Sequence, residues 1–157
     1  IGETLKSGYQ NATMENVCGI PGDGQFDLNE LKSWPTVPRH SVVSFFRPKK
    51  QGYNLYRHSL SLANRWINRI FLGLSLRDIN WVKIYKASDV QCLEICSVSP
   101  FVETEICYKL RKKDYKFIEQ PSCYLERIAG HSHGGSLFHV FQSLKDSLNL
   151  LLSKTQI

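Results

Sequence analysis

The sequence lacks several features that would assign a class of protein at once. No apolar stretch reaches the roughly 20 residues that span a bilayer, and no basic segment followed by an apolar run resembles a signal peptide. There is no internal repeat and no low-complexity segment. These absences predict a soluble cytoplasmic protein, or one that lies peripherally on the cytoplasmic face of a membrane.

The five cysteines lack the spacing of a metal site. None forms a Cys-x-x-Cys pair, and no second pair with histidine completes a zinc site beside Cys92 and Cys96. His131 and His133 lie in a glycine-rich loop without further recognisable ligands. An odd number of thiols without paired spacing predicts reduced, mostly buried cysteines, as in the cytosol.

What the chain does contain suits one compact domain. It has 157 residues, of which 42% are hydrophobic and 22% charged, enough for a packed core and against wholesale disorder. The net charge of +6 favours anionic partners, which include nucleic acids, phosphorylated substrates and anionic membrane surfaces.

Hydrophobic periodicity predicts strands that alternate with helices. Helices are expected at 2–13, 28–34, 55–72, 89–95, 101–113 and 136–153, and strands at 16–20, 41–46, 81–86, 115–120 and 122–127. Asp27 and Glu30 have capping-box spacing at the start of the second helix, and Gly73 is placed to end the third. The pattern predicts an α/β layered sheet over residues 1–135, followed by an amphipathic helix in 136–157.

The segment Pro21-Gly22-Asp23-Gly24-Gln25 directly follows a predicted strand. A carboxylate in a glycine-rich turn at the end of a strand reaches into the crevice where α/β sheets bind ligands. Asp23 and Gln25 both carry oxygen ligands suited to Mg²⁺ or Mn²⁺. The alternative is a simple turn in which Asp23 forms the turn and binds nothing.

Two basic segments have the composition of phosphate-binding sites. Arg47 follows a strand and precedes Lys49 and Lys50, with Arg57 ten residues further on. Arg127 precedes a glycine turn and Ser132. Arginine grips phosphate through two parallel hydrogen bonds, so both segments are candidate phosphate clamps, and solvated surface loops are the alternative.

Two acidic residues are candidates for general-base chemistry. Asp78 lies in a short segment of mixed charge that ends at Lys83, where an ordinary local ion pair is the alternative. Glu105 lies near the start of a predicted helix, where it can serve a cleft or merely complement the helix dipole.

Taken in order, these residues resemble the family-two glycosyltransferases of the GT-A fold, in particular the branch of dolichyl- and polyprenyl-phosphate sugar transferases. That branch shows Asp-x-Asp-x-Gln, a strand ending in Arg, an Arg in the next helix, Asp-x-x-x-x-Lys/Arg-x-Tyr, a helical Glu, and Arg-x-x-Gly-x-Ser. The matching residues are Asp23 with Gln25, Arg47, Arg57, Asp78 with Lys83 and Tyr85, Glu105, and Arg127 with Gly130 and Ser132. The match covers most of residues 2–135.

The resemblance implies transfer of a sugar, with inversion, from a nucleotide-sugar to a polyprenyl-phosphate or glycan acceptor. It assigns Mg²⁺ or Mn²⁺ to Asp23 and Gln25, and the phosphates to Arg47, Arg57, Lys83, Arg127 and Ser132. A polyprenyl phosphate is already an anion and needs no strong base, whereas a sugar hydroxyl would need Asp78 or Glu105. The last helix is expected either to touch the membrane or to pack on the sheet.

Two departures from the family bear on this prediction. Pro21 stands where the family has its first motif aspartate, and nothing before Ile1 resembles the opening nucleotide-binding half. We expect that half to be encoded upstream or supplied by a partner chain. The alternatives are a non-catalytic interaction module descended from such enzymes and, ranked last, a basic domain that binds nucleic acid.

Overall fold

The computed structural model describes residues 2–48, 55–97, 99–126 and 137–152, with only the backbone described at 55–58, 137–140 and 143. The elements along the chain are α1 (Gly2–Gln10), β1 (Asn16–Cys18), the 3-10 helix η1 (Leu28–Ser33), β2 (Ser41–Phe46), α2 (Leu55–Leu72), β3 (Lys83–Lys86), α3 (Ala87–Gln91), α4 (Val102–Lys112), β4 (Lys116–Pro121) and α5 (Leu137–Leu152). Strands and helices thus alternate much as the periodicity predicts.

Two predicted elements differ from the structure. The strand predicted at 122–127 is wrong for the part described, because 122–126 forms one isolated bridge, from Tyr124 to Phe26. The segment that it pairs with, residues 25–26, is irregular and does not form a continuous ladder of strand hydrogen bonds with it. Helix α3 ends at Gln91, short of the predicted position, because the chain beyond it turns Leu93 and Ile95 into the core.

The strands form one open mixed sheet in the order β1-β3-β2-β4. β3 is antiparallel to β1 and β2, and β2 is parallel to β4. β1, β2 and β4 therefore run in one direction, and their carboxyl ends share one edge of the sheet with the start of β3. The prediction of an α/β sheet with flanking helices is confirmed at this level.

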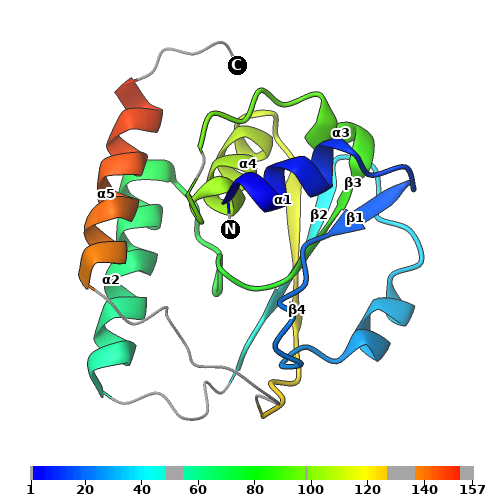
Figure 1. The fold of residues 1–157 in the computed structure, drawn as a ribbon, viewed down its shortest axis with the longest axis horizontal. Coiled ribbons are helices and arrows are strands. Elements are labelled where there is room, and N and C mark those ends of the chain that lie inside the picture. Colours follow the sequence, from blue (N-terminus) through cyan, green and yellow to red (C-terminus); the bar gives the residue numbers. More distant parts are fainter. Residues whose placement is uncertain (1, 49–54, 98, 127–136, 153–157) are drawn as a thin grey trace.

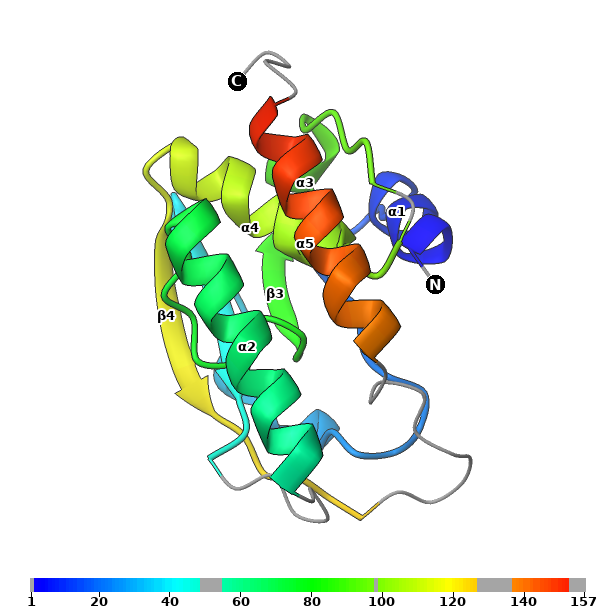
Figure 2. The same ribbon diagram turned by 90° about the vertical axis from the view of Figure 1, so that its left-hand side faces the viewer.

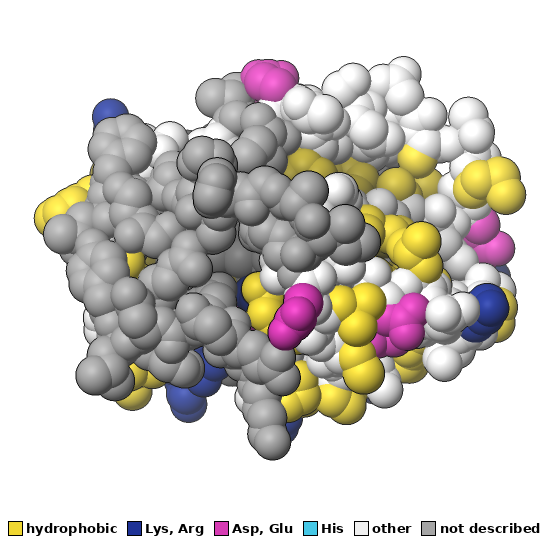
Figure 3. Space-filling view, turned by 60° about the horizontal axis from the view of Figure 1, so that its bottom comes forward, with side chains coloured by type: hydrophobic (Ala, Val, Ile, Leu, Met, Phe, Trp, Pro, Cys, Tyr) yellow, Lys and Arg dark blue, Asp and Glu magenta, His cyan; other side chains and the backbone are white. Residues whose placement is uncertain are grey.

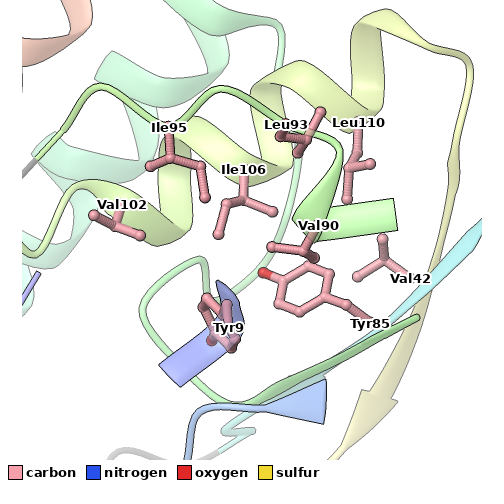
Figure 4. Close-up of a cluster of buried hydrophobic side chains, with 9 residues drawn as sticks. All are labelled: Tyr9, Val42, Tyr85, Val90, Leu93, Ile95, Val102, Ile106 and Leu110. Atoms are coloured by element: carbon pink, nitrogen blue, oxygen red, sulfur yellow. The ribbon is translucent and has the colours of Figure 1, made fainter. Parts of the chain in front are cut away.

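Both faces of the sheet are covered. Helices α1, α3 and α4 enclose a core on one face, where Tyr85 and Val42 of the sheet meet Ile106 and Leu110 of α4 (Figure 4). The segment between β1 and β2, which includes η1, covers the other face and packs on Val43, Phe45 and Ile84. Within that segment Asp27 accepts a hydrogen bond from the Asn29 N–H at 2.9 Å, which confirms it as the helix cap.

Helices α2 and α5 lie side by side at one side of the molecule (Figures 1 and 2). Gly73 ends α2 with a positive φ of 64°, as predicted. The apolar side chains of Leu62, Trp66 and Ile70, which recur every four residues along α2, do not face the core, because all three are exposed. No helix in the described part of the chain is long and apolar enough to cross a bilayer.

The prediction of mostly buried cysteines is also wrong. All five are free thiols, but Cys92, Cys96 and Cys123 are exposed, Cys18 is half-buried and only Cys107 is fully buried. The exposed thiols lie in short connections between elements, where no hydrophobic layer covers them.

Candidate functional site

The carboxyl edge of the sheet brings together three segments that the sequence singled out and the segment that follows β4 (Figure 1). The 21–27 turn follows β1, Arg47 follows β2, Asp78 precedes β3, and the 122–126 segment follows β4. Viewed from this end, the described surface shows hydrophobic and acidic side chains next to one another, with scattered basic ones (Figure 3).

Arg47 and Asp78 are joined across this edge by a two-point ion pair. Nε of Arg47 donates to Oδ2 of Asp78 at 2.7 Å, and a terminal guanidinium nitrogen donates to Oδ1 at 3.1 Å. Only 9% of the Arg47 side chain and 5% of the Asp78 side chain are exposed. The alternative of a local ion pair around Asp78 is thus wrong, since its partner lies 31 residues away, directly after strand β2.

Aromatic rings hold the Arg47 guanidinium in place. Its central carbon lies 4.3 Å from the ring centroid of Trp81 and 5.3 Å from that of Tyr124. A guanidinium that contacts two rings and a carboxylate keeps its charge and loses its freedom to rotate.

The Asp23–Gln25 turn is attached to the same group. Oδ1 of Asp23 accepts the Gln25 N–H at 3.2 Å, so Asp23 does form the turn that the sequence allowed as its alternative role. The buried Gln25 amide donates to the Tyr124 hydroxyl at 2.8 Å, and the Leu125 N–H donates to the Gln25 carbonyl at 3.0 Å. Contacts therefore run without a break from Asp23 through Gln25 and Tyr124 to Arg47.

Lys83 lies beneath the loop that carries Asp78. Its ammonium group is fully buried and donates to the carbonyls of Ile79 at 2.5 Å and Trp81 at 3.0 Å. It also pairs with Glu103 at 3.3 Å. This arrangement lets Lys83 fix the position of Asp78 and Trp81; its predicted contact with phosphate stays a prediction.

Glu103 is the centre of a buried polar cluster that the sequence did not reveal. It accepts hydrogen bonds from the hydroxyls of Tyr9 and Tyr85 as well as from Lys83. Burial, reinforced by the nearby Glu103 charge, raises the pKa of Tyr9 and that of Tyr85 far above the usual range. Burial likewise raises the pKa of the Cys107 thiol to about 11, so this cluster holds protonated hydroxyls and an unreactive thiol around one ion pair.

Glu105, the second predicted base, is fully buried under the 94–97 loop. Its two oxygens accept the N–H groups of Cys96 at 2.9 Å and Ser97 at 2.8 Å, and Lys109 pairs with it at 2.8 Å. Burial opposes ionisation of this carboxyl, but these three donors outweigh it and lower its pKa. Among the described residues, the partners of Glu105 are Cys96, Ser97 and Lys109, and these do not include Arg47, Asp78, Trp81 or Tyr124.

Three predicted phosphate ligands lie outside the described part of the chain. Residues 127–136 include Arg127 and Ser132, and of Arg57 only the backbone is described. The basic residues at 49 and 50 fall in the same category. Their predicted roles stay predictions.

A small polar pocket lies next to Asp78, between α2 and the chain that follows it. Its walls are formed by Ser61, Asn64, Arg65, Asn68, Leu74, Leu76, Arg77, Asp78, Ile79 and Asn80. Asn68 is only 2% exposed, and neither its amide nitrogen nor its amide oxygen has a hydrogen-bond partner among the described residues. A buried amide without partners is costly, so this pocket suits a small polar group that both donates and accepts.

The residues at the turn fit a divalent cation only in part. Asp23 is half-buried and supplies a carboxylate, whereas the Gln25 amide is buried and directed at Tyr124. Among the described residues no group of three or more acidic, histidine or cysteine side chains is placed to hold a metal. Mg²⁺ is commonly held by one or two carboxylates together with phosphate oxygens of the substrate, which is the fit that Asp23 allows.

The comparisons with known proteins add no family to this picture. No family model, no curated protein and no solved structure matches the chain. The ordered motif residues and the geometry at the sheet edge therefore carry the functional argument by themselves.

Two residues of the site had no assigned role in the sequence. Trp81 was part of the segment from Arg77 to Lys83, and Tyr124 lay in a predicted strand. Their aromatic character three residues after Asp78 and three before Arg127 was the available signal. Only the folded chain shows that both rings stack on the same guanidinium.

Proposed function

We propose that this chain forms the diphosphate- and acceptor-side part of an inverting family-two glycosyltransferase of the GT-A fold. In this proposal a sugar passes from a nucleoside diphosphate to a polyprenyl phosphate. Support comes from the meeting of Asp23, Arg47 and Asp78, in the family's order, at the carboxyl edge of one sheet. Open α/β sheets bind their ligands at this edge.

The hydrogen-bond partners of the two candidate bases, Asp78 and Glu105, indicate which kind of acceptor the site suits. Asp78 gives both oxygens to Arg47, and Glu105 gives both to backbone N–H groups and Lys109. Neither carboxylate is placed to take a proton from a sugar hydroxyl. A phosphate acceptor is already an anionic nucleophile and requires no such base, so the geometry favours it over a glycan.

In this mechanism the chain supplies charge and position. Arg47, fixed by Asp78 and Trp81, provides a preorganised positive charge where negative charge develops on the departing diphosphate. Arg57, Arg127 and Ser132 are proposed to bind the phosphates, and Lys83 to hold the loop that carries Asp78. Asp23 would hold Mg²⁺ or Mn²⁺ together with the diphosphate, and that ion would act as a Lewis acid for the leaving group.

The outer side of strand β1, at the lateral end of the sheet, is a candidate position for a nucleotide-binding half. β1 pairs with β3 on one side, and among the described strands none pairs with its other side. An unpaired strand edge presents main-chain donors and acceptors to a further strand. We propose that the half that binds base and ribose, from the same protein or from a partner chain, continues the sheet at β1.

Electron paramagnetic resonance of Mn²⁺ tests this site directly. We expect the chain to immobilise Mn²⁺ in the presence of uridine or guanosine diphosphate and to bind it weakly without the nucleotide. Asp23→Asn should weaken the ternary complex by roughly tenfold, since it removes the charged ligand. Asp114→Asn is the matched control, because Asp114 is exposed, lies elsewhere and has a positive φ of 59° that asparagine tolerates.

Equal affinity of the two variants would contradict the metal role of Asp23. The transferase reaction itself needs a second measurement, in which a radioactive nucleotide-sugar and a polyprenyl phosphate are supplied to the chain joined with its nucleotide-binding half. Binding without any transfer of sugar would instead favour the non-catalytic interaction module.

A further inference from the structure

Helix α2 has polar side chains on its buried face and an apolar stripe on its outer face, although Leu72 at its end belongs to the core. Asn68 is buried at 2% exposure, and Ser61 and Asn64 face the same polar pocket. The opposite face carries Leu62, Trp66 and Ile70, which are 51%, 52% and 67% exposed. Their spacing of four residues places them along one stripe, so the apolar face of α2 points away from the protein.

Helix α5 also exposes an apolar stripe, although its Leu150 packs on the core cluster that contains Leu72 and Phe101. Ser147 is fully buried against the protein, whereas Phe141, Leu148 and Leu152 are 68%, 40% and 78% exposed. These three residues lie at helical spacing along one face. A helix that buries serine and exposes phenylalanine and leucine is adapted to an apolar medium on its outer side.

The two helices together form one outer surface. They lie side by side at the same side of the molecule in both views (Figures 1 and 2). Neither helix is long and apolar enough to cross a bilayer. A helix of this kind contacts a membrane with its side, lying parallel to the membrane surface.

The charged side chains beside the apolar stripes indicate what kind of apolar environment the two helices contact. Arg69 of α2 and Lys145 of α5 are exposed, whereas Arg65 lines the polar pocket and donates to the Arg77 carbonyl at 2.9 Å. Helix α2 contains no acidic residue, and the one acidic residue of α5, Asp146, accepts a hydrogen bond from Ser99 at 2.8 Å. Basic side chains beside Trp, Phe and Leu are typical of helices that lie in the interface of an anionic membrane, where tryptophan also prefers to reside.

We propose that α2 and α5 form a membrane-docking surface, with Leu62, Trp66, Ile70, Phe141, Leu148 and Leu152 in the acyl boundary of a bilayer and Arg69 and Lys145 at its anionic headgroups. From the sequence, membrane contact was expected of the last helix alone; this surface adds α2, from the middle of the chain. Docking to a membrane does not depend on sugar transfer, so an experiment can show either one without the other.

Vesicle flotation tests the apolar part of the surface. The full chain should float with phosphatidylcholine vesicles that contain phosphatidylglycerol, and less with phosphatidylcholine alone. The triple variant Trp66→Ser, Ile70→Ser, Phe141→Ser should lose at least about tenfold in partitioning, because three large apolar side chains no longer leave water. Met14→Ser with Leu28→Ser is the matched control, since these side chains are 75% and 61% exposed but lie elsewhere.

Charge and depth are tested separately. Arg69→Gln with Lys145→Gln should reduce partitioning by roughly tenfold on the anionic vesicles only, while Lys112→Gln with Lys113→Gln, exposed on α4 and just after it, should change little. Fluorescence of Trp66 should shift to the blue on anionic vesicles and be quenched by lipids brominated in the acyl chain. The same spectra of a Trp66→Phe variant identify the part of the emission that comes from Trp66.

Four results would overturn the proposal. They are absence of flotation by the folded chain, equal losses in the triple variant and in its control, a Trp66 emission that vesicles leave unchanged, and a dimer in sedimentation equilibrium that the triple variant abolishes. The last would assign the surface to a second copy of the chain. Because every replaced apolar side chain is more than half exposed and the replaced basic ones are exposed, unchanged circular dichroism is expected and separates loss of binding from loss of fold.

Discussion

The carboxylate of Asp78 receives two hydrogen bonds from the guanidinium of Arg47, at 2.7 and 3.1 Å, although the two residues are 31 positions apart. One follows β2 and the other precedes β3, and the antiparallel pairing of these strands brings them to the same edge of the sheet. Both side chains are more than nine-tenths buried, so neither charge has water to replace its partner.

Removing either partner should therefore be costly. Arg47→Met and Asp78→Leu are each expected to lower the free energy of unfolding by about 3–5 kcal/mol, because each leaves one buried charge without its partner. The double variant should recover much of this loss. Urea unfolding of the three variants measures the coupling, and additive losses would show that the pair does not act as a unit.

The buried Glu105 predicts a specific acid sensitivity. Its pKa is lowered in the folded protein, so it contributes stability that is fully present above its unfolded pKa of about 4.3 and is lost as the pH falls through the lower folded value. Glu105→Gln should flatten this acid limb of stability against pH. The control Glu94→Gln changes an exposed carboxyl in the same loop, and an equally flat limb there would contradict the assignment.

Thiol reactivity should follow the positions of the five cysteines. We expect Cys92, Cys96 and Cys123 to react quickly with iodoacetamide in the native protein, and Cys107 only on unfolding, because it is buried and its pKa is raised to about 11. Mass spectrometry of labelled peptides over time reads each site. Fast labelling of Cys107 under native conditions would show that the Glu103 cluster opens readily.

Two glycines should respond in opposite directions to alanine. Gly73 has a φ of 64°, so Gly73→Ala is expected to cost about 1 kcal/mol through backbone strain alone, since no atom lies within 4 Å of the added methyl group. Gly8 is in the interior of α1 with equal space, and Gly8→Ala should stabilise by about 0.5–1 kcal/mol. Thermal unfolding distinguishes the two, and a loss for both would point to packing and not to φ.

Local sequence determined most of the secondary structure. Apolar periodicity places β2 at residues 41–46 and α2 at 55–72, and both have these bounds in the structure. The short side chain of Asp27 fixes the start of η1, and the positive φ of Gly73 ends α2, because these effects depend on a few neighbouring residues. Of the ordered motif residues, Asp23, Arg47 and Asp78 lie at the carboxyl edge of the sheet, whereas Glu105 lies apart from them.

Partners and exposure were decided only by the tertiary structure. Glu30 has the spacing of a capping box, yet its carboxylate accepts the Cys123 N–H at 2.7 Å, 93 residues away. The stripe of α2 through Trp66 reads as core, since periodicity shows that a helix has an apolar face but not which way that face points. Its direction depends on how α2 packs beside α5 and on the burial of Asn68, and these are contacts between segments far apart in the chain.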